Sequence, residues 1–223
     1  MNRFRLAAVG ALALVAFAAA PALAMTWGGE VFGTFDTHSM SDWKDQVFDP
    51  IKSSGGSISD PTSSWGGGLG LRMWPNSTWM LAATYEPIFL TRKEDVTNAK
   101  FDLGANSFQV TGGYFFPSPG NAKFGVGAGI GYYSLNGKIT GTGGPPPSGA
   151  DGDLSGSTVG FHFMGMGEWT MSPGFAITGS AGYRIAKISD TKLNDQSSSP
   201  EFATDYSGFM LRAGVAFYMP TKQ

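Results

Sequence analysis

The stretch FMLRAGVAF, residues 209–217, decides the fold, because two kinds of residue alternate along it. The first, third, fifth, seventh and ninth positions are all apolar, and the only charge, Arg212, falls between them. Successive side chains of a β-strand point to opposite faces. The stretch therefore predicts a strand with one wholly apolar face and a second face that holds a charge.

The same alternation recurs in seven other segments, and no segment shows a convincing helical period. Each predicted strand has 11–15 residues, which is long enough for a tilted strand that crosses a membrane. The sequence therefore predicts an all-β fold, an eight-stranded antiparallel transmembrane β-barrel of the outer-membrane type. The predicted strands are 26–38, 64–74, 79–90, 105–116, 123–135, 157–171, 175–186 and 206–218.

Charge separates the two faces in all eight predicted strands. The phase that carries the large apolar residues has no charge, and every charged residue within a strand falls in the opposite phase. A soluble barrel or a secreted β-sandwich would place its charges in water and its apolar phase inside. An apolar exterior with charges inside is stable only against lipid. The inward charges are Glu30, Asp36, Arg72, Glu86, Lys123, Glu168, Arg184 and Arg212.

Short and long connections alternate along the chain, as they do in transmembrane barrels. Tight turns rich in proline, glycine and asparagine join some strands, and long polar segments join the others. We expect the short turns and both termini in the periplasm and four long loops outside, none of which carries net positive charge. The predicted long loops are 39–63, 91–104, 136–156 and 187–205.

Composition excludes several classes of function. Of 223 residues, 33 are glycine, two are histidine and none is cysteine, and the net charge is −2. A chain without a basic surface is a poor binder of nucleic acid. Without cysteine it has no disulfide, thiolate ligand, thiol nucleophile or lipoprotein anchor. We therefore expect no cofactor and no nucleic-acid partner.

Residues 1–24 have the pattern of a secretory signal peptide. Arg3 and Arg5 precede an apolar run, and Ala22-Leu23-Ala24 supplies a small-x-small cleavage site. The run is short for a spanning helix, which makes a retained membrane anchor the weaker alternative. The predicted organisation is a signal peptide over 1–24 and one barrel domain over 25–223.

The mature chain resembles the small outer-membrane β-barrel superfamily of the OmpA-barrel, OmpX and OmpW type. Arg212, Gly214, Phe217 and Met219 look like the family's C-terminal assembly signal, although residues 220–223 follow where the family ends in an aromatic residue. The resemblance implies integral localisation in a bacterial outer membrane. It also implies contact with outer-membrane lipid and lipopolysaccharide, and with the barrel-assembly machinery during insertion.

The inward charges are expected to pair, because an unpaired charge in so narrow a barrel is costly. The pairs would form either a polar plug that fixes register or a charge gate. On this interpretation Arg212→Leu destabilises by about 3–5 kcal/mol if it leaves a carboxylate unpaired. The predicted interior network has Glu30, Arg72 and Glu168 toward the periplasm, Glu86 and Arg184 toward the outside, and Arg212 between them.

Small and bulky residues also alternate inside the predicted barrel. Strand 123–135 turns glycines inward at 125, 127, 129 and 131, while methionines and phenylalanines point inward from other strands. Small residues opposite large ones fill a narrow barrel. The alternative is an apolar tunnel walled by adaptable methionines.

Two segments could carry chemistry. In the segment 36–42, His38 could activate Ser39 or Ser41, although serine and aspartate are ordinary loop residues. The segment 151–156, DGDLSG, matches the first half of a calcium loop, but the position that should be glutamate is His162, and we expect an acidic turn there. We therefore predict no catalytic residue and no metal site.

The leading hypothesis for function is a non-enzymatic outer-membrane barrel, structural or surface-interacting through its long loops, since loops on a rigid scaffold carry function. The sequence names no extracellular partner. A second hypothesis is a narrow channel for small hydrophobic or amphipathic molecules, as the OmpW resemblance implies. A third is a lipid-modifying enzyme of the outer membrane.

Overall fold

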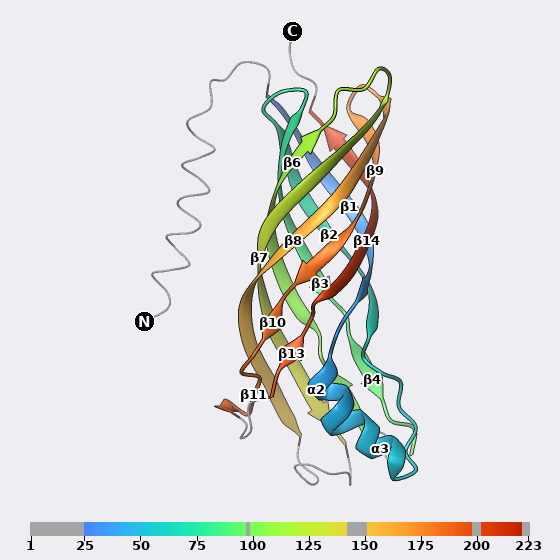
Figure 1. The fold of residues 1–223 in the computed structure, drawn as a ribbon, viewed down its shortest axis with the longest axis vertical. Helices are drawn as coiled ribbons and strands as arrows, with labels where there is room; N and C mark the ends of the chain where they lie inside the picture. The colour runs from blue at the N-terminus through green and yellow to red at the C-terminus, as the bar shows by residue number, and fades with distance from the viewer. Residues whose placement is uncertain (1–24, 97–98, 142–150, 198–201, 220–223) are drawn as a thin grey trace.

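The computed structural model describes residues 25–96, 99–141, 151–197 and 202–219, which form a closed antiparallel barrel (Figure 1). The predicted signal peptide, residues 1–24, and the last four residues, 220–223, lie outside the described residues. The barrel strands are β1 (Thr26–Thr37), β2 (Ser63–Trp74), β3 (Trp79–Ile88), β6 (Ala105–Phe115), β7 (Ala122–Thr140), β8 (Gly152–Ser172), β9 (Phe175–Ile185) and β14 (Gly208–Tyr218).

Each barrel strand pairs with its neighbours in the chain, and β14 pairs with β1 to close the barrel. Closure leaves no free strand edge, which a strand in lipid requires. The prediction of an eight-stranded antiparallel barrel is confirmed, and most strand boundaries agree within three residues.

The two faces of the strands differ as the alternation predicts. On β14 the Leu211 side chain is 56% exposed and its neighbour Arg212 is 9% exposed, and on β2 Trp65 is 75% exposed. On the barrel strands the outward-facing positions carry no charge up to Asn136 on β7 and Ser155 on β8, and we call this outer surface the apolar belt. Such a surface is stable in the hydrocarbon of a membrane.

The connections at one end of the barrel are short. Residues 75–78, 116–121 and 173–174 join the strands there, next to the ends of β1 and β14. Gly174 adopts a φ of 91°, which favours glycine and lets β8 turn directly into β9. Short turns are typical of the periplasmic end, so the opposite end is the outer one.

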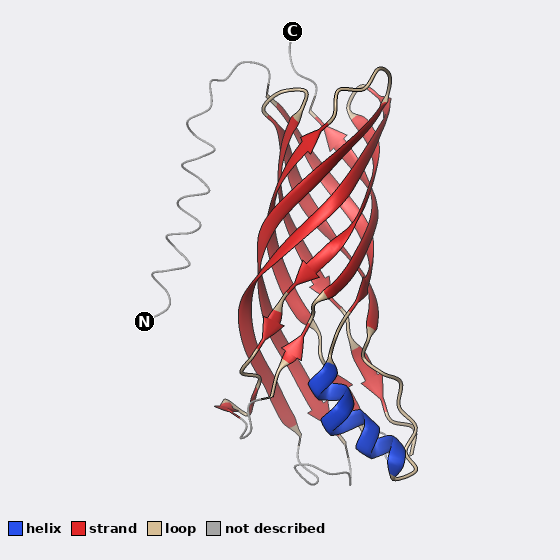
Figure 2. Cartoon of the chain, in the orientation of Figure 1, coloured by secondary structure: helices blue, strands red, loops and turns tan. Residues whose placement is uncertain are grey.

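The outer end holds helices and short strands where the sequence predicted loops (Figure 2). Three consecutive short helices follow β1, and none of the described helices is long or apolar enough to cross a membrane. The elements are α2 (Ser41–Trp43), η1 (Lys44–Phe48, a π-helix), α3 (Asp49–Ser53), β4 (Thr91–Lys93), β5 (Lys100–Asp102), β10 (Lys187–Ile188), β11 (Lys192–Leu193), β12 (Gln196–Ser197) and β13 (Thr204–Asp205).

The prediction of a loop over 136–156 was wrong at both its ends. Strand β7 continues to Thr140 and β8 begins at Gly152, so these two strands extend well beyond the outer ends of the other barrel strands (Figure 1). Their pairing is supported on either side, because β5 pairs with β7 and β11 pairs with β8. The triple-proline segment falls within 142–150, outside the described residues.

An apolar core fills the outer end. We call residues 38–62, 88–104, 133–141, 151–158 and 186–207, where described, the outer head. Its core draws on all four long connections and on the outer ends of the strands. Burial of these side chains holds the connections together by the hydrophobic effect. The core residues are Met40, Trp43, Phe48, Ile58, Ile88, Leu90, Phe101, Leu103, Ala105, Tyr133, Leu135, Leu154, Ala186, Ile188 and Tyr206.

A second apolar cluster lies inside the barrel toward the periplasm. Methionines from three strands form much of it, as the inward phase predicts. Its buried residues are Trp74, Met80, Ala82, Phe115, Met164, Met166 and Met210.

Candidate functional site

Arg184 lies at the centre of a buried ion cluster beneath the outer head, which we call the outer cluster. Its Nη1 lies 3.4 Å from Glu86 Oε1, and its Nη2 lies 3.6 Å from Asp36 Oδ1. The other Glu86 oxygen accepts a hydrogen bond from Arg212 Nη2, which also donates to Gln109 Oε1 at 2.8 Å. The side chains of Arg184 and Glu86 are 0% exposed, so these charges are balanced by protein groups and not by bulk water.

The outer cluster is bonded directly to the outer head. Arg184 Nε donates to the backbone carbonyl of Tyr206 at 3.1 Å, and the Tyr206 hydroxyl donates to the carbonyl of Leu103 at 2.6 Å. The Arg184 guanidinium also lies 5.6 Å from the centroid of the Tyr133 ring. Tyr133 and Tyr206 belong to the core of the head, so the charged layer and the apolar core are continuous.

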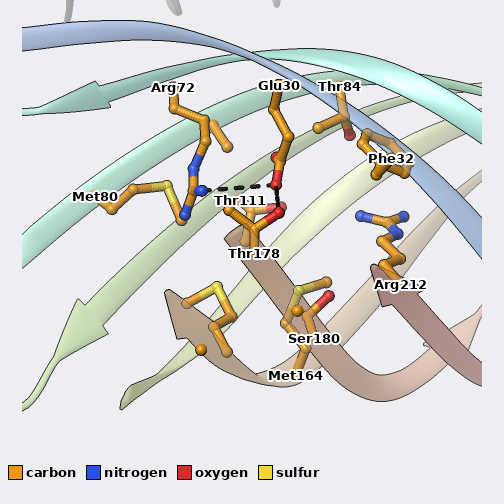
Figure 3. A pocket seen from close by; sticks show the side chains of 14 residues that line it. Glu30, Phe32, Arg72, Met80, Thr84, Thr111, Met164, Thr178, Ser180 and Arg212 are labelled. Carbon is orange, nitrogen blue, oxygen red and sulfur yellow. Dashed lines mark hydrogen bonds and ion pairs between the residues drawn. The ribbon is translucent and has the colours of Figure 1, made fainter. Parts of the chain in front are cut away.

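A second group, the inner cluster, lies nearer the periplasm and surrounds Arg72. Figure 3 shows Arg72 with two of its members, Glu30 and Thr178. Arg72 Nη1 lies 3.1 Å from Glu168 Oε2 and 3.6 Å from Glu30 Oε1. Thr178 donates to Glu30 at 2.6 Å, and the Tyr218 hydroxyl donates to Glu168 at 2.5 Å. Each of the two carboxylates that share Arg72 thus also accepts a hydrogen bond from a neutral hydroxyl group.

A cavity of about 40 Å³ lies between the two clusters, bordered by Arg72 on one side and Arg212 on the other (Figure 3). Arg72 Nε, Arg212 Nε and Thr84 Oγ1 have no hydrogen-bond partner among the described residues. A cavity of this size that is lined by polar atoms suits a few water molecules. We therefore expect solvent to satisfy these donors inside the barrel.

The six predicted network residues divide between these two clusters. Glu30, Arg72 and Glu168 meet in the inner cluster, and Glu86, Arg184 and Arg212 meet in the outer one. The predicted network omitted Asp36 and Gln109, which the structure adds to the outer cluster. Alternation already places both side chains inside, so their inward phase was the available signal.

The glycines of β7 make room for large side chains opposite them. A Cβ on Gly127 would lie 2.8 Å from Met166 Cε, and one on Gly129 would lie 2.6 Å from His162 Nε2. His162 is buried, and its Nε2 lies 2.8 Å from the Thr111 hydroxyl. This packing agrees with the predicted match of small and large residues.

The structure pairs His38 with a serine, but not with either predicted one. His38 Nε2 lies 2.8 Å from Ser64 Oγ, whereas Ser41 Oγ donates to Asp42. Both His38 and Ser64 are buried, and His38 Nδ1 has no hydrogen-bond partner within the described ranges. A histidine without an orienting carboxylate, next to a covered serine, lacks the geometry of a catalytic triad.

The burial of His38 predicts a dependence of stability on pH. Burial, helped by the nearby Arg184, lowers the pKa of His38 from 6.5 to about 3. Unfolding therefore takes up a proton between these values, so the contribution of neutral His38 is complete above pH 6.5 and is lost as the pH falls toward 3. We expect a loss of up to about 4 kcal/mol in the free energy of unfolding over this range.

Denaturant titrations of the reconstituted protein at pH 7 and pH 4 measure this loss. Carboxylates titrate over the same range, so the comparison is with His38→Gln, whose side chain can still bond Ser64. The variant should lose less stability than the parent protein on acidification. Equal losses in the two proteins would contradict a neutral, buried His38.

The segment 151–156 is neither a calcium loop nor the acidic turn that we expected. Residues 152–155 belong to β8, so their side chains alternate instead of converging on one point. Asp151 pairs with Lys138 at 3.6 Å, and the Asp153 backbone N–H donates to Asn194 at 2.9 Å. In the part of the chain that is described, no group of three or more His, Asp or Glu side chains is placed to hold a metal ion.

Comparison with known proteins identifies the architecture. The model of the family described as outer membrane protein beta-barrel domain matches residues 6–217. No curated protein sequence matches this chain.

Solved outer-membrane barrels are similar in fold. A major outer membrane protein from Thermus thermophilus has 11% identity and a TM-score of 0.57, with 88% of this chain and 100% of that one covered. OprG from Pseudomonas aeruginosa has 11% identity and a TM-score of 0.54, with coverage of 88% and 96%. The N-terminal barrel domain of OprF from the same organism has 13% identity and a TM-score of 0.48, with coverage of 87% and 97%. At these identities the likeness of the first two structures shows the fold alone.

Proposed function

We propose that this chain, which belongs to the outer membrane protein β-barrel domain family, is a closed barrel that acts through the surface of its outer head. In this role the barrel anchors and orients the head, and it neither conducts solutes nor catalyses a reaction. The family places the protein in the bacterial outer membrane. Export by a signal peptide over 1–24 and insertion by the barrel-assembly machinery are parts of the same proposal.

The observation that carries this proposal is the apolar core of the outer head. Segments that are far apart in sequence supply it, and Trp43 and Tyr206 are 2% and 0% exposed within it. A passage for solutes has no need of a packed core across its mouth. A display surface needs one, because its contact residues must be held in a fixed arrangement.

The outer cluster supports closure of the barrel beneath the head. Arg184, Glu86 and Asp36 are completely or almost completely buried, which leaves little room for water beside them. Moving an ion past these groups would require breaking buried charge pairs, which costs several kcal/mol. The outer cluster also lies between the apolar core of the head and the apolar cluster inside the barrel. The described interior therefore offers no continuous apolar path.

The second candidate is a charge-gated pore, and the cavity between the clusters favours it. Arg72 and Arg212 border this cavity with unpartnered donors, so a change of ion-pair partners could connect it to either side. Closure is the better supported state, because the head covers the outer side of the outer cluster.

Single-channel recording in planar bilayers tests the proposal. The refolded protein, Arg212→Leu and Glu168→Gln are compared under one voltage protocol. We expect no discrete openings of the parent protein, because two buried clusters and the head lie along the axis. Openings of the parent protein that both variants alter would overturn closure and establish the charge-gated pore instead.

A further inference from the structure

His38 lies where the first barrel strand passes into the outer head. It follows β1 directly, and α2 begins three residues later. Its ring is buried, and Nε2 lies 2.8 Å from Ser64 Oγ at the outer end of β2. On its other side the ring lies 5.8 Å from the Tyr206 ring, at an angle of 88°. One side chain therefore touches both the end of a barrel strand and the core of the head.

Tyr206 connects the His38 ring to the rest of the head. Its backbone N–H donates to the Ala186 carbonyl at 2.8 Å, and its hydroxyl donates to the Leu103 carbonyl at 2.6 Å. Its own carbonyl accepts a hydrogen bond from Arg184 Nε at 3.1 Å. A change at the His38 ring is thus passed through Tyr206 to two other connections of the head and to the outer cluster.

The backbone that follows His38 is built to release. The Ser39 N–H donates to the Ser207 carbonyl at 2.9 Å, and the Met40 N–H donates to the Asp205 carbonyl at 3.2 Å. Met40 adopts a φ of 44°, a left-handed conformation that is unfavourable for residues other than glycine. Moving this segment away breaks few hydrogen bonds and relieves that conformation. The strands below it are held by long, continuous ladders on both sides of β1.

The charged groups around His38 oppose a positive charge on its ring. Arg184 of β9 and Arg92 of β4 both act against it. Glu86 of β3 favours a positive ring, but two arginines already share this carboxylate. Asp36 of β1 pairs with Arg184 as well. A protonated His38 therefore finds no carboxylate that is free to balance it.

The hydrogen bonds around the ring suit only its neutral form. A protonated imidazole has two N–H donors. Ser64 can accept from Nε2, but Nδ1 has no partner among the described residues. The nearby carbonyl of Tyr206 already accepts from Arg184. A buried cation with an unsatisfied donor is unfavourable, whereas the same ring in water is satisfied on both sides.

We propose that His38 is an acid-sensitive latch: a proton taken up by its ring releases the outer head from the ends of the strands, while the barrel stays folded. The latch rests on the proposed display function, because it controls when the display surface is held in its fixed arrangement. It adds to that function a response to the pH of the surroundings.

The size of the response follows from the two states of the ring. Burial lowers the pKa of His38 from 6.5 to about 3 in the closed head. A released ring has its ordinary pKa, so the closed head is favoured above pH 6.5 and the open population grows as the pH falls below it. Between pH 7.5 and pH 5 this population should rise about thirtyfold. Ordinary carboxylates titrate below this window, so histidine dominates the change.

Amide hydrogen exchange of the protein in nanodiscs at pH 7.5 and pH 5 tests the latch. Each rate is divided by the intrinsic rate of an unprotected amide at the same pH, which leaves the protection due to structure. Residues 41–53 report on the head, and β14 reports on the barrel. The test variant is His38→Gln, and the matched control is His162→Gln. His162 is the second of the two histidines in the chain and is buried inside the barrel beside Thr111.

We expect residues 41–53 to lose protection about thirtyfold on acidification in the parent protein and in His162→Gln, with β14 unchanged. In His38→Gln the loss should stay below about threefold. Equal losses in His38→Gln and the parent protein would overturn the proposal, as would an unchanged head or an equal loss in β14.

A second measurement covers the case in which His38→Gln opens the head at every pH. The parent protein alone should then lose head protection about eightfold between pH 6 and pH 5, the dependence expected for one proton. A change of less than about twofold in this interval would overturn the latch. These outcomes leave the conductance of the parent protein at neutral pH untouched, so failure of the latch is distinct from failure of the display function.

Discussion

Glu86→Leu is expected to lower the free energy of unfolding by about 3–5 kcal/mol. Glu86 is the carboxylate that both outer-cluster arginines share, at Arg184 Nη1 and Arg212 Nη2. Its removal leaves two guanidinium groups in a buried layer with Asp36 as the remaining carboxylate of the cluster. Removing one partner of a buried ion pair is more costly than replacing the whole pair.

Guanidinium unfolding in phospholipid vesicles, followed by tryptophan fluorescence, measures this loss. Asp45→Leu is the matched control, because Asp45 is an exposed carboxylate on η1. Arg212→Leu should cost less than Glu86→Leu, since Glu86 then keeps Arg184 as a partner. If Glu86→Leu and Asp45→Leu unfold at the same denaturant concentration, the outer cluster contributes nothing to stability.

Trp43→Ala is expected to open the outer head while the barrel stays folded. The Trp43 ring packs against Phe202 with 4.8 Å between centroids and against Phe101 with 6.5 Å. Its Nε1 donates to the Thr204 hydroxyl at 2.9 Å. Truncation of a buried tryptophan costs about 3–5 kcal/mol, which exceeds what three short helices can recover by themselves.

Limited proteolysis of proteoliposomes measures the opening. We expect cleavage within residues 38–62 to become at least about tenfold faster, in proportion to the population of the open head. Gln46→Ala is the control, since Gln46 is exposed on the same helical segment. Heat-modified migration in gels should stay normal for both variants, which separates opening of the head from failure of the barrel. Cleavage at the parent rate in Trp43→Ala would show that the ring does not hold the head.

The strands were predictable because the membrane constrains them strongly. Lipid outside and a narrow interior impose a period of two on every barrel strand, with charge allowed in one phase only. In β14 this separates Leu211 from Arg212, and the structure agrees. Turn signals such as Pro173-Gly174 then mark where a strand reverses.

The outer head was missed, although the sequence holds a signal for its helices. Met40, Trp43, Val47, Phe48 and Ile51 have helical spacing, and all five are buried or pack against the core. Their partners come from other connections that are distant in sequence. A short amphipathic segment becomes stable only through such tertiary contacts, which local periodicity does not reveal.

The sequence could predict which charged side chains face the interior, but not which of them form ion pairs. Alternation shows that Asp36, Glu86 and Arg184 all face inward. Their mutual contact depends on the stagger of the strands around the barrel, which sets the height of each side chain. Register such as Asp36 opposite Ser64 and Glu86 opposite Ser107 is a property of the closed barrel and is not encoded in any one strand.

Amide hydrogen exchange of the intact protein in nanodiscs tests the central claim, that the outer segments form one folded head closing the barrel. The peptides that decide it cover α2 to α3, the extensions of β7 and β8 beyond the belt, and residues 202–206. Buried, bonded amides in these peptides should exchange over hours, as those of the barrel do, because they open only with the shared core. Exchange of all these peptides within seconds, beside a protected barrel, would mean independent mobile loops and would contradict the account.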